Sequence, residues 1–126
     1  MKVEISNGEL VDKVTILSIK REKITVPEKL KNVEKEFSIL RKEMSTLGIS
    51  EETPEYQELL RVNRELWDIE DQLRKKEAAQ VFDDEFIRLA RKVYFTNDKR
   101  SEIKRRINQM TDSDLIEEKT YVDYRK

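Results

Sequence analysis

Apolar residues recur along this chain at alternating steps of three and four positions, the spacing of helices that pack along a narrow seam. Four stretches carry the pattern. The clearest seam lies in the second stretch and comprises Leu30, Val33, Phe37, Leu40, Met44 and Leu47. The pattern predicts four helices and an all-α fold.

Each predicted helix begins with a recognisable capping signal. The predicted N-terminal caps are Ser6, Thr25, Thr53 and Asp83 or Asp84. In the first two, Glu9 or Glu28 three residues later completes a capping box. Pro54 favours the start of the third helix, and Gly48 is expected to end the second as a left-handed cap. The helix boundaries can therefore be predicted as well as the helices.

Long helices with short connections fold back on one another, which predicts an antiparallel helical bundle or long helical hairpins with coiled-coil-like seams. The third and fourth helices are expected to turn near residues 81–83. Residues 1–126 are read as a single helical domain. For the tail, 112–126, a short helical turn is the most that is expected, and its order is left open. Narrow seams in a small chain leave apolar surface uncovered, so a homodimer or other homo-oligomer is expected.

Composition narrows the classes of function. Charged residues make up 42% of the chain, against about 25% in an ordinary globular protein, but the net charge is −1 and the apolar spacing is regular, so disorder is rejected. The chain has no Cys and no His, which removes thiolate metal sites and the commonest general base. No apolar run reaches about 18 residues and the N-terminus lacks a signal sequence, so a cytoplasmic protein without a membrane span is expected. Balanced charge disfavours nucleic acid as a partner.

Polar residues gather on the side of the third and fourth helices that should face the core. Glu70 and Asn63 fall beside the apolar row of the third helix. The inward positions of the fourth helix between its apolar residues are Thr96, Asn97, Arg100 and Lys104. If the two helices form a hairpin, one layer contains Asn63, Trp67, Glu70, Tyr94, Asn97 and Arg100, to which the first helix can add Lys13 and Arg21. A buried charge without a partner costs several kcal/mol, so the layer must be paired internally or hydrated.

Three interpretations of this layer stand side by side. It can be a structural layer that fixes helix register, as a buried Asn does in coiled coils, and this is the favoured reading. It can be a pocket for an anionic or hydroxylated small molecule, with Trp67 and Tyr94 stacking and Arg100 neutralising charge. It can also be simple snorkelling of long side chains at the bundle edge.

Catalytic and metal chemistry find little support in the sequence. The carboxylates that could hold magnesium on two helices are Glu70, Glu77, Asp98 and Glu102, but Asp98 and Glu102 are expected to point outward. No glycine-rich phosphate loop and no nucleophile–base pair is present. No catalytic residue, metal site or cofactor is predicted, and whether the protein is an enzyme stays open.

Four segments occur in a recognisable order, namely ISNGELVDKVTILSIKREKI, RELWDIEDQLR, FIRLARKVYFTNDKR and LIEEKTY. Together, with their motifs ELxDKxTIL, LWxIED, VYxxND and EEKxY, they resemble an uncharacterised bacterial family of short helical proteins about the length of this chain. Its members are often associated with loci for surface-polysaccharide or glycosyl-transfer proteins, which implies an accessory role in such a system. The first motif contains Glu9, Asp12 and Lys13 in the first helix. The second and third motifs coincide with the polar layer, and the last motif lies in the tail, which the layer does not include.

Two functional hypotheses follow. The first is a non-enzymatic helical interaction module, homodimeric, that acts as an accessory or scaffold for a protein partner. The second is a small-molecule binding protein or enzyme that uses the polar layer on a sugar nucleotide or phosphate. Both depend on the third and fourth helices forming one hairpin.

Overall fold

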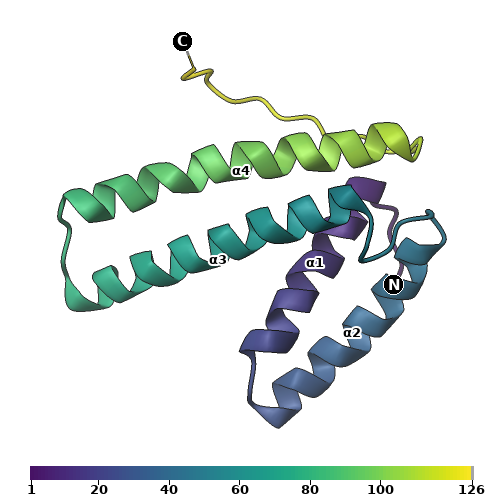
Figure 1. Ribbon diagram of the computed structural model, residues 1–126, viewed down its shortest axis with the longest axis horizontal. Coiled ribbons are helices and arrows are strands. Elements are labelled where there is room, and N and C mark those ends of the chain that lie inside the picture. The colour runs from purple at the N-terminus through teal and green to yellow at the C-terminus, as the bar shows by residue number, and fades with distance from the viewer. Residues whose placement is uncertain (126) are drawn as a thin grey trace.

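The computed structural model describes residues 1–125, and its four helices form two antiparallel hairpins that cross (Figure 1). The helices are α1 (Asn7–Lys23), α2 (Pro27–Ser45), α3 (Pro54–Ala79) and α4 (Asp84–Met110). The predicted all-α bundle of long hairpins is therefore confirmed. Among residues 1–125, no helix combines the length and the apolar character that crossing a membrane requires.

Most of the predicted helix boundaries are correct. The Ser6 hydroxyl accepts a hydrogen bond from the Glu9 backbone N–H, and the Asp83 carboxylate accepts one from Phe86. Thr53 precedes Pro54 at the start of α3, and α3 turns into α4 through a left-handed Gln80. Gly48 is left-handed as predicted, with φ of 74°, although α2 already ends at Ser45.

The predicted cap at Thr25 is wrong. The residue at the N-cap of α2 is Val26, which is extended and makes no side-chain capping bond. Pro27 occupies the first helical position, where its fixed φ suits the helix and its missing N–H costs nothing. A residue before proline is held in the extended region, so the helix starts directly at Pro27 rather than at Thr25.

α1 is the central helix of the fold because it packs against α2, α3 and α4, whereas α2 packs on α1. Val11 and Val14 of α1, Leu59 of α3 and Ile107 of α4 are fully buried in one common core. Since α1 has neighbours on several sides, polar residues of α1 are also buried, among them Asp12 and Thr15.

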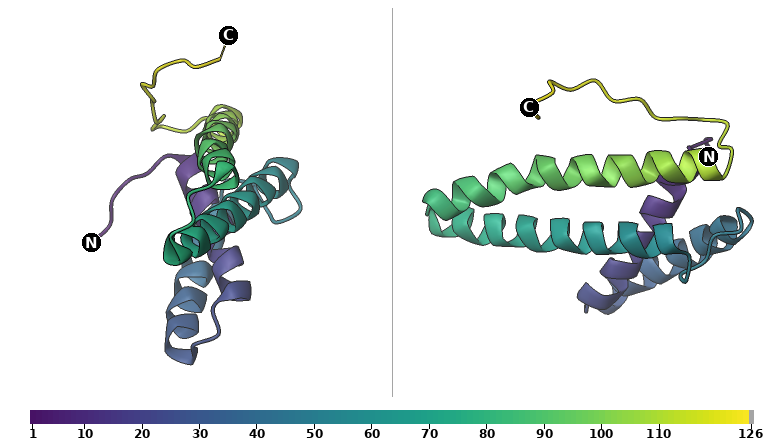
Figure 2. Two further views of the ribbon diagram at one scale, coloured as in Figure 1. Left: turned by 90° about the vertical axis from the view of Figure 1, so that its left-hand side faces the viewer. Right: turned by 45° about the horizontal axis from the view of Figure 1, so that its top comes forward.

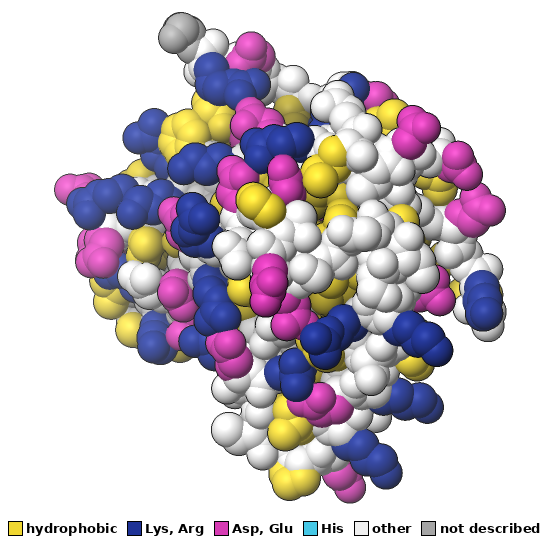
Figure 3. Space-filling view, turned by 45° about the vertical axis from the view of Figure 1, so that its right-hand side comes forward, with side chains coloured by type: hydrophobic (Ala, Val, Ile, Leu, Met, Phe, Trp, Pro, Cys, Tyr) yellow, Lys and Arg dark blue, Asp and Glu magenta, His cyan; other side chains and the backbone are white. Residues whose placement is uncertain are grey.

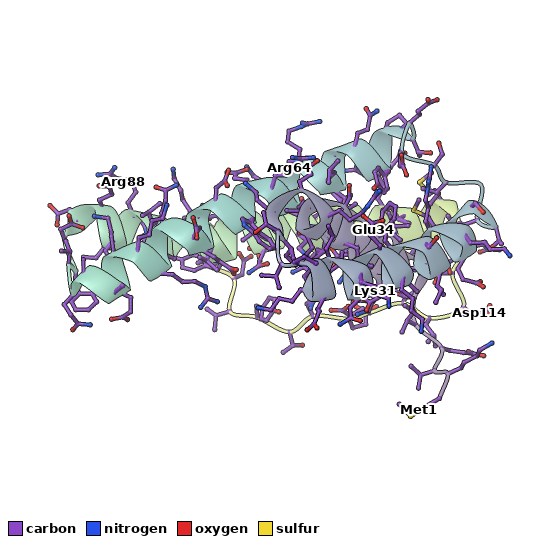
Figure 4. The ribbon with its side chains drawn as sticks, turned by 90° about the horizontal axis from the view of Figure 1, so that it is seen from below. Met1, Lys31, Glu34, Arg64, Arg88 and Asp114 are labelled. Carbon is purple, nitrogen blue, oxygen red and sulfur yellow. The ribbon has the colours of Figure 1, made fainter. Side chains whose placement is uncertain are left out.

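The far part of the α3–α4 hairpin extends beyond the α1–α2 hairpin (Figures 1 and 2). In the view from below, Arg88 marks this far part of α4, well separated from Lys31 and Glu34 of α2 (Figure 4). Within residues 1–125, each of these two helices has the other as its only helical neighbour in this part. Large apolar residues therefore stay accessible, with Phe82 52% and Ile87 55% exposed.

The C-terminal segment, residues 113–125, runs back along α4 (Figure 2). It has no regular secondary structure, so the expected short helical turn does not form. Its start is held by Ser113, whose hydroxyl accepts a hydrogen bond from the Asn7 backbone N–H at 3.0 Å. Residues 114–125 are all exposed.

Candidate functional site

A buried carboxylate, Asp12 of α1, is the centre of the polar layer and is 1% exposed. Its Oδ1 accepts hydrogen bonds from Arg100 Nε at 2.9 Å and from Asn63 Nδ2 at 2.8 Å. Its Oδ2 accepts a further hydrogen bond from Arg100 Nη2. The Asn63 amide also donates to Thr15 Oγ1 at 2.9 Å. Both oxygens of the carboxylate are thus paired, which offsets the cost of burying its charge.

Gly8 explains how α1 comes close enough to α4 for this contact. A Cβ at Gly8 would lie 2.3 Å from the Lys104 carbonyl oxygen, nearer than two such atoms can approach. The Gly8 N–H instead donates to the Asn108 side-chain oxygen at 2.6 Å. Gly8, Asp12 and Thr15 follow one another at steps of four and three, so they share one face of α1. Gly8 lets α4 approach α1 closely, and this brings Arg100 within hydrogen-bonding distance of Asp12.

Lys104 of α4 joins this layer to the C-terminal segment. Its side chain is only 12% exposed, and its Nζ lies 2.7 Å from Glu9 Oε2, 3.5 Å from Glu117 Oε2 and 3.9 Å from Asp12 Oδ2. Glu117 also pairs with Lys119 in the same segment. The hydrogen bond from Lys119 lowers the pKa of Glu117, and the hydrogen bond to Asp12 raises the pKa of Arg100. Both shifts favour the charged forms of Glu117 and Arg100.

A cleft with a volume of about 660 Å³ lies between α4 and the C-terminal segment. Cationic, aromatic and small polar side chains line it together. The lining residues are Tyr94, Asn97, Asp98, Arg100, Ser101, Lys104, Lys119, Tyr121, Val122 and Tyr124. Arg100 and Lys104 thus belong both to the buried layer and to the wall of this cleft.

The far end of the cleft is closed by aromatic rings. Tyr124 packs edge-on against Tyr94 and Phe95, with ring centroids 5.1 Å and 5.0 Å away. Its hydroxyl donates a hydrogen bond to Asp98 Oδ2. This bond to a carboxylate raises the pKa of Tyr124 to about 12. The end of the segment is therefore attached to α4 by a ring contact and a charged acceptor.

One protein-family model, described as a family of unknown function (DUF6165), matches residues 1–124. The chain belongs to the DUF6165 family. No curated protein and no solved structure matches it at a significant level. The match covers every segment of this DUF6165 chain that contributes to the cleft.

Several of the predicted layer residues lie where the sequence places them. Asn63 is buried against Asp12, and Thr96 is buried at 3% exposure. Arg100 and Asn97 are half-buried next to each other, with Nη1 of the first 3.5 Å from Oδ1 of the second. Tyr94 is 43% exposed and lines the cleft, whereas Trp67 is half-buried on α3 outside the cleft lining.

The inward placement of Glu70 is wrong, because Glu70 is exposed. α1 crosses α3 near Asn63 and does not continue along the far part of the hairpin (Figure 1). Beyond the crossing only α4 covers α3, so the buried face narrows to the side of Leu66 and Ile69. Glu70 falls on the side that α1 would have covered. The buried carboxylate of the layer is Asp12 instead.

Lys13 and Arg21 also lie outside the layer. Lys13 is exposed, with its Nζ 3.8 Å from Glu9. Arg21 lies over the Phe37 ring at 4.2 Å and pairs with Glu34 at 2.8 Å. The predicted acidic positions Asp98 and Glu102 bind Tyr124 and Arg125, and residues 1–125 contain no cluster of three acidic side chains placed to hold a metal ion.

Asp12 is the residue that helical periodicity missed. Its row, Gly8, Asp12, Thr15 and Ile19, is a second buried face of α1, and only its last member is a large apolar residue. A row of this composition does not stand out as an apolar stripe. The resemblance to the bacterial family did point to Asp12, because its first motif, ELxDKxTIL, contains both Glu9 and Asp12. The small residue Gly8 one turn earlier is the physical sign of a close helix contact.

Proposed function

We propose that this protein is a small-molecule binding module whose ligand combines an anionic group with a hydroxylated ring, as a sugar nucleotide does. The supporting observation is the cleft under the C-terminal segment, where cations and aromatic rings line one space of about 660 Å³. Ligand pockets commonly have volumes of about 300–1,000 Å³. A ligand of nucleotide size would be accommodated.

The groups along α4 are arranged in the order such a ligand needs. Lys104 lies at one end of the cleft and Tyr94 at the other, ten residues apart, which is about 15 Å along a helix. Asn97 and Ser101 lie between them and can hydrogen-bond hydroxyl groups. The cation would bind the anionic end, and the tyrosine rings offer stacking area for a planar or sugar ring.

The buried layer fixes the orientation of Arg100, a cation that lines the cleft. Asp12 contacts it at two nitrogens, which restricts the guanidinium to one orientation before any ligand arrives. A side chain ordered in advance loses less conformational freedom on binding, so more of the interaction energy appears as affinity. In this proposal the layer has a structural part, Asp12 with Asn63, and a ligand-facing part, Arg100.

An accessory role in surface-polysaccharide or glycosyl-transfer systems, in the cytoplasm of a bacterium, is proposed with it. Sugar nucleotides are activated donors for glycosyl transfer, so a module that binds one would suit such a system. A sugar nucleotide is a better candidate than nucleic acid, because basic and acidic side chains are interspersed on the face shown in Figure 3 and do not form one basic area. A nucleic-acid backbone would need such an area.

A homodimeric interaction module is the second candidate. It is favoured by the exposed apolar residues at the far end of the α3–α4 hairpin, among them Val81, Phe82 and Ile87. Two hairpins packed side by side would make a four-helix arrangement in which these residues are covered. The apolar residues of this second candidate do not belong to the lining of the cleft.

Calorimetric titration of the full chain with UDP-glucose tests the binding function, with glucose as the uncharged control. We expect UDP-glucose to bind and glucose to give no measurable heat. The variant Lys119→Ala should weaken binding by about tenfold, or about 1.4 kcal/mol. Lys99→Ala is the matched control, since Lys99 is an exposed lysine outside the cleft lining. Absence of binding by UDP-glucose, UDP and pyrophosphate alike would contradict the proposed function.

A further inference from the structure

Lys104 lies among three carboxylates that come from different parts of the chain. Glu9 and Asp12 belong to α1, whereas Glu117 belongs to the C-terminal segment. The distances from Lys104 Nζ are 2.7 Å to Glu9, 3.9 Å to Asp12 and 3.5 Å to Glu117. Both carboxylate oxygens of Asp12 already accept hydrogen bonds from Arg100 and Asn63. Of the remaining two carboxylates, only Glu117 stands on a segment without secondary structure.

Glu117 lies beside the cleft, in an adjoining hollow whose lining includes Lys104 and Lys119, the two lysines that also line the cleft. One of its oxygens contacts Lys104 and the other contacts Lys119, and both lysines line the cleft. A phosphate group presents the same arrangement, with two or more oxygens toward two ammonium groups. The chain thus supplies an internal anion at the cationic end of its own cleft.

The cations around this position outnumber the carboxylates. Four cations, Lys13, Arg100, Lys104 and Lys119, are connected through ion pairs to three carboxylates, Glu9, Asp12 and Glu117. If Glu117 moves away, the group has two more cations than carboxylates. With Glu117 in place the group carries one net positive charge. A phosphate dianion in place of Glu117 would make the group neutral, whereas an uncharged ligand would leave two positive charges uncompensated.

The contacts that hold Glu117 in place are weak enough to be exchanged. The pair of Glu117 with Lys119 joins two exposed side chains, and such pairs contribute about 0–1 kcal/mol. The contact of Glu117 with the more buried Lys104 is long, at 3.5 Å. Glu118 pairs with Arg105 at 3.1 Å, and Arg125 lies 3.4 Å from Glu102. Ser113 is bonded to Asn7 and the Tyr124 hydroxyl to Asp98, so both ends of the segment stay attached and only the part around Glu117 has to shift.

We propose that the phosphate of the ligand binds between Lys104 and Lys119 by displacing the carboxylate of Glu117, so that the C-terminal segment is both part of the cleft and a competitor for its anionic end. This inference rests on the proposed binding function. It assigns the anionic end of the ligand to Lys104 rather than to the tyrosine end. Glu9 stays in place, because it is on a helix and only 2.7 Å from Lys104.

Titration of the full chain with pyrophosphate and with UDP-glucose, for the wild type, Glu117→Gln and Glu118→Gln, tests the inference. Glu118 is the matched control, because it is the neighbouring exposed glutamate but pairs with Arg105, which does not line the cleft, rather than with the two cleft lysines. We expect Glu117→Gln to bind both compounds about three- to tenfold more tightly, since the competing carboxylate is gone. Glu118→Gln should stay within about twofold of the wild type.

The outcomes separate the two proposals. Binding by the wild type with no tightening in Glu117→Gln, or equal tightening in both variants, overturns the displacement of Glu117 and leaves the binding function standing. Absence of binding of both compounds to all three proteins overturns the binding function and this inference together. Tightening for UDP-glucose without tightening for pyrophosphate also overturns the inference, because the displaced position would not be the phosphate position.

Discussion

Asp12 of α1 and Arg100 of α4, 88 residues apart, form an ion pair with contacts at two guanidinium nitrogens. The carboxylate is buried at 1% exposure, whereas the Arg100 side chain keeps 29% exposure on the cleft side. The pair therefore links the interior of the fold to the surface where we propose ligand binding. Its loss should affect both stability and binding.

The first prediction concerns Asp12. Replacing Asp12 by Asn leaves Arg100 without a counter-charge in a partly buried position, so the free energy of unfolding should fall by about 3 kcal/mol. Urea denaturation followed by circular dichroism measures this. Glu70→Gln is the control, because Glu70 is exposed and its substitution should change stability by at most about 0.5 kcal/mol. Equal losses in the two variants would contradict the placement of the buried carboxylate.

A second prediction concerns the contact between α1 and α4 at Gly8. An added methyl group would collide with the Lys104 carbonyl oxygen, so Gly8→Ala should destabilise the protein by about 3 kcal/mol. The comparison is Gly48→Ala, where nothing lies within 4 Å and the left-handed backbone is the only obstacle. That change should cost about 1–2 kcal/mol. A Gly8→Ala protein as stable as the wild type would refute the close packing of the two helices.

The attachment of the C-terminal segment gives a prediction about pH. Because Asp98 accepts a hydrogen bond from the Tyr124 hydroxyl, the pKa of Tyr124 is raised from 10.0 to about 12. The raised value means that this contact stabilises the attached segment below pH 10 and is lost as the pH rises from 10 to 12. Burial also raises the pKa of Tyr56, so absorbance titration at alkaline pH should show late-ionising tyrosines, with one fewer in Tyr124→Phe and with Tyr124 shifted toward pH 10 in Asp98→Asn. A Tyr124→Phe titration identical in shape to the wild type, scaled for one fewer tyrosine, would contradict the contact.

The exposed end of the α3–α4 hairpin predicts the oligomeric state. If Phe82 and Ile87 form a homodimer contact, light scattering after size exclusion should give twice the chain mass for the wild type and the monomer mass for Phe82→Ser/Ile87→Ser. Ile39→Ser is the control, because Ile39 is also 55% exposed but lies on α2. A monomeric wild type at high concentration, or a dimer broken only by Ile39→Ser, would argue against this interface.

The helices and the α3–α4 hairpin could be predicted from the sequence because each depends on local spacing and capping residues. The predicted layer was correct at Asn63 and Arg100, which contact Asp12 where α1 crosses the hairpin, and Thr96 is buried as its inward position predicts. It failed at Glu70, because periodicity within one helix does not reveal where a neighbouring helix ends. The position of α1 depends on the contact between Gly8 and α4, more than ninety residues apart in the chain, and no pattern within either helix specifies it.

The cleft was beyond prediction for a related reason. It is completed by the C-terminal segment, whose path along α4 is set by isolated contacts such as those of Glu117 and Tyr124 rather than by a repeating pattern. Single polar contacts of this kind leave no periodic trace in a sequence. The resemblance had indicated only that the tail belongs to the family motifs, which is compatible with its place in the cleft wall.

The location of ligand binding tests the central claim most directly. Backbone NMR spectra of the isotope-labelled full chain, recorded during titration with UDP-glucose, report every residue that senses the ligand. The account predicts the largest shifts at residues 94–104 and 117–124, with small shifts on α2. Shifts concentrated on α2 or at the far end of the α3–α4 hairpin, or a spectrum that UDP-glucose leaves unchanged, would contradict it.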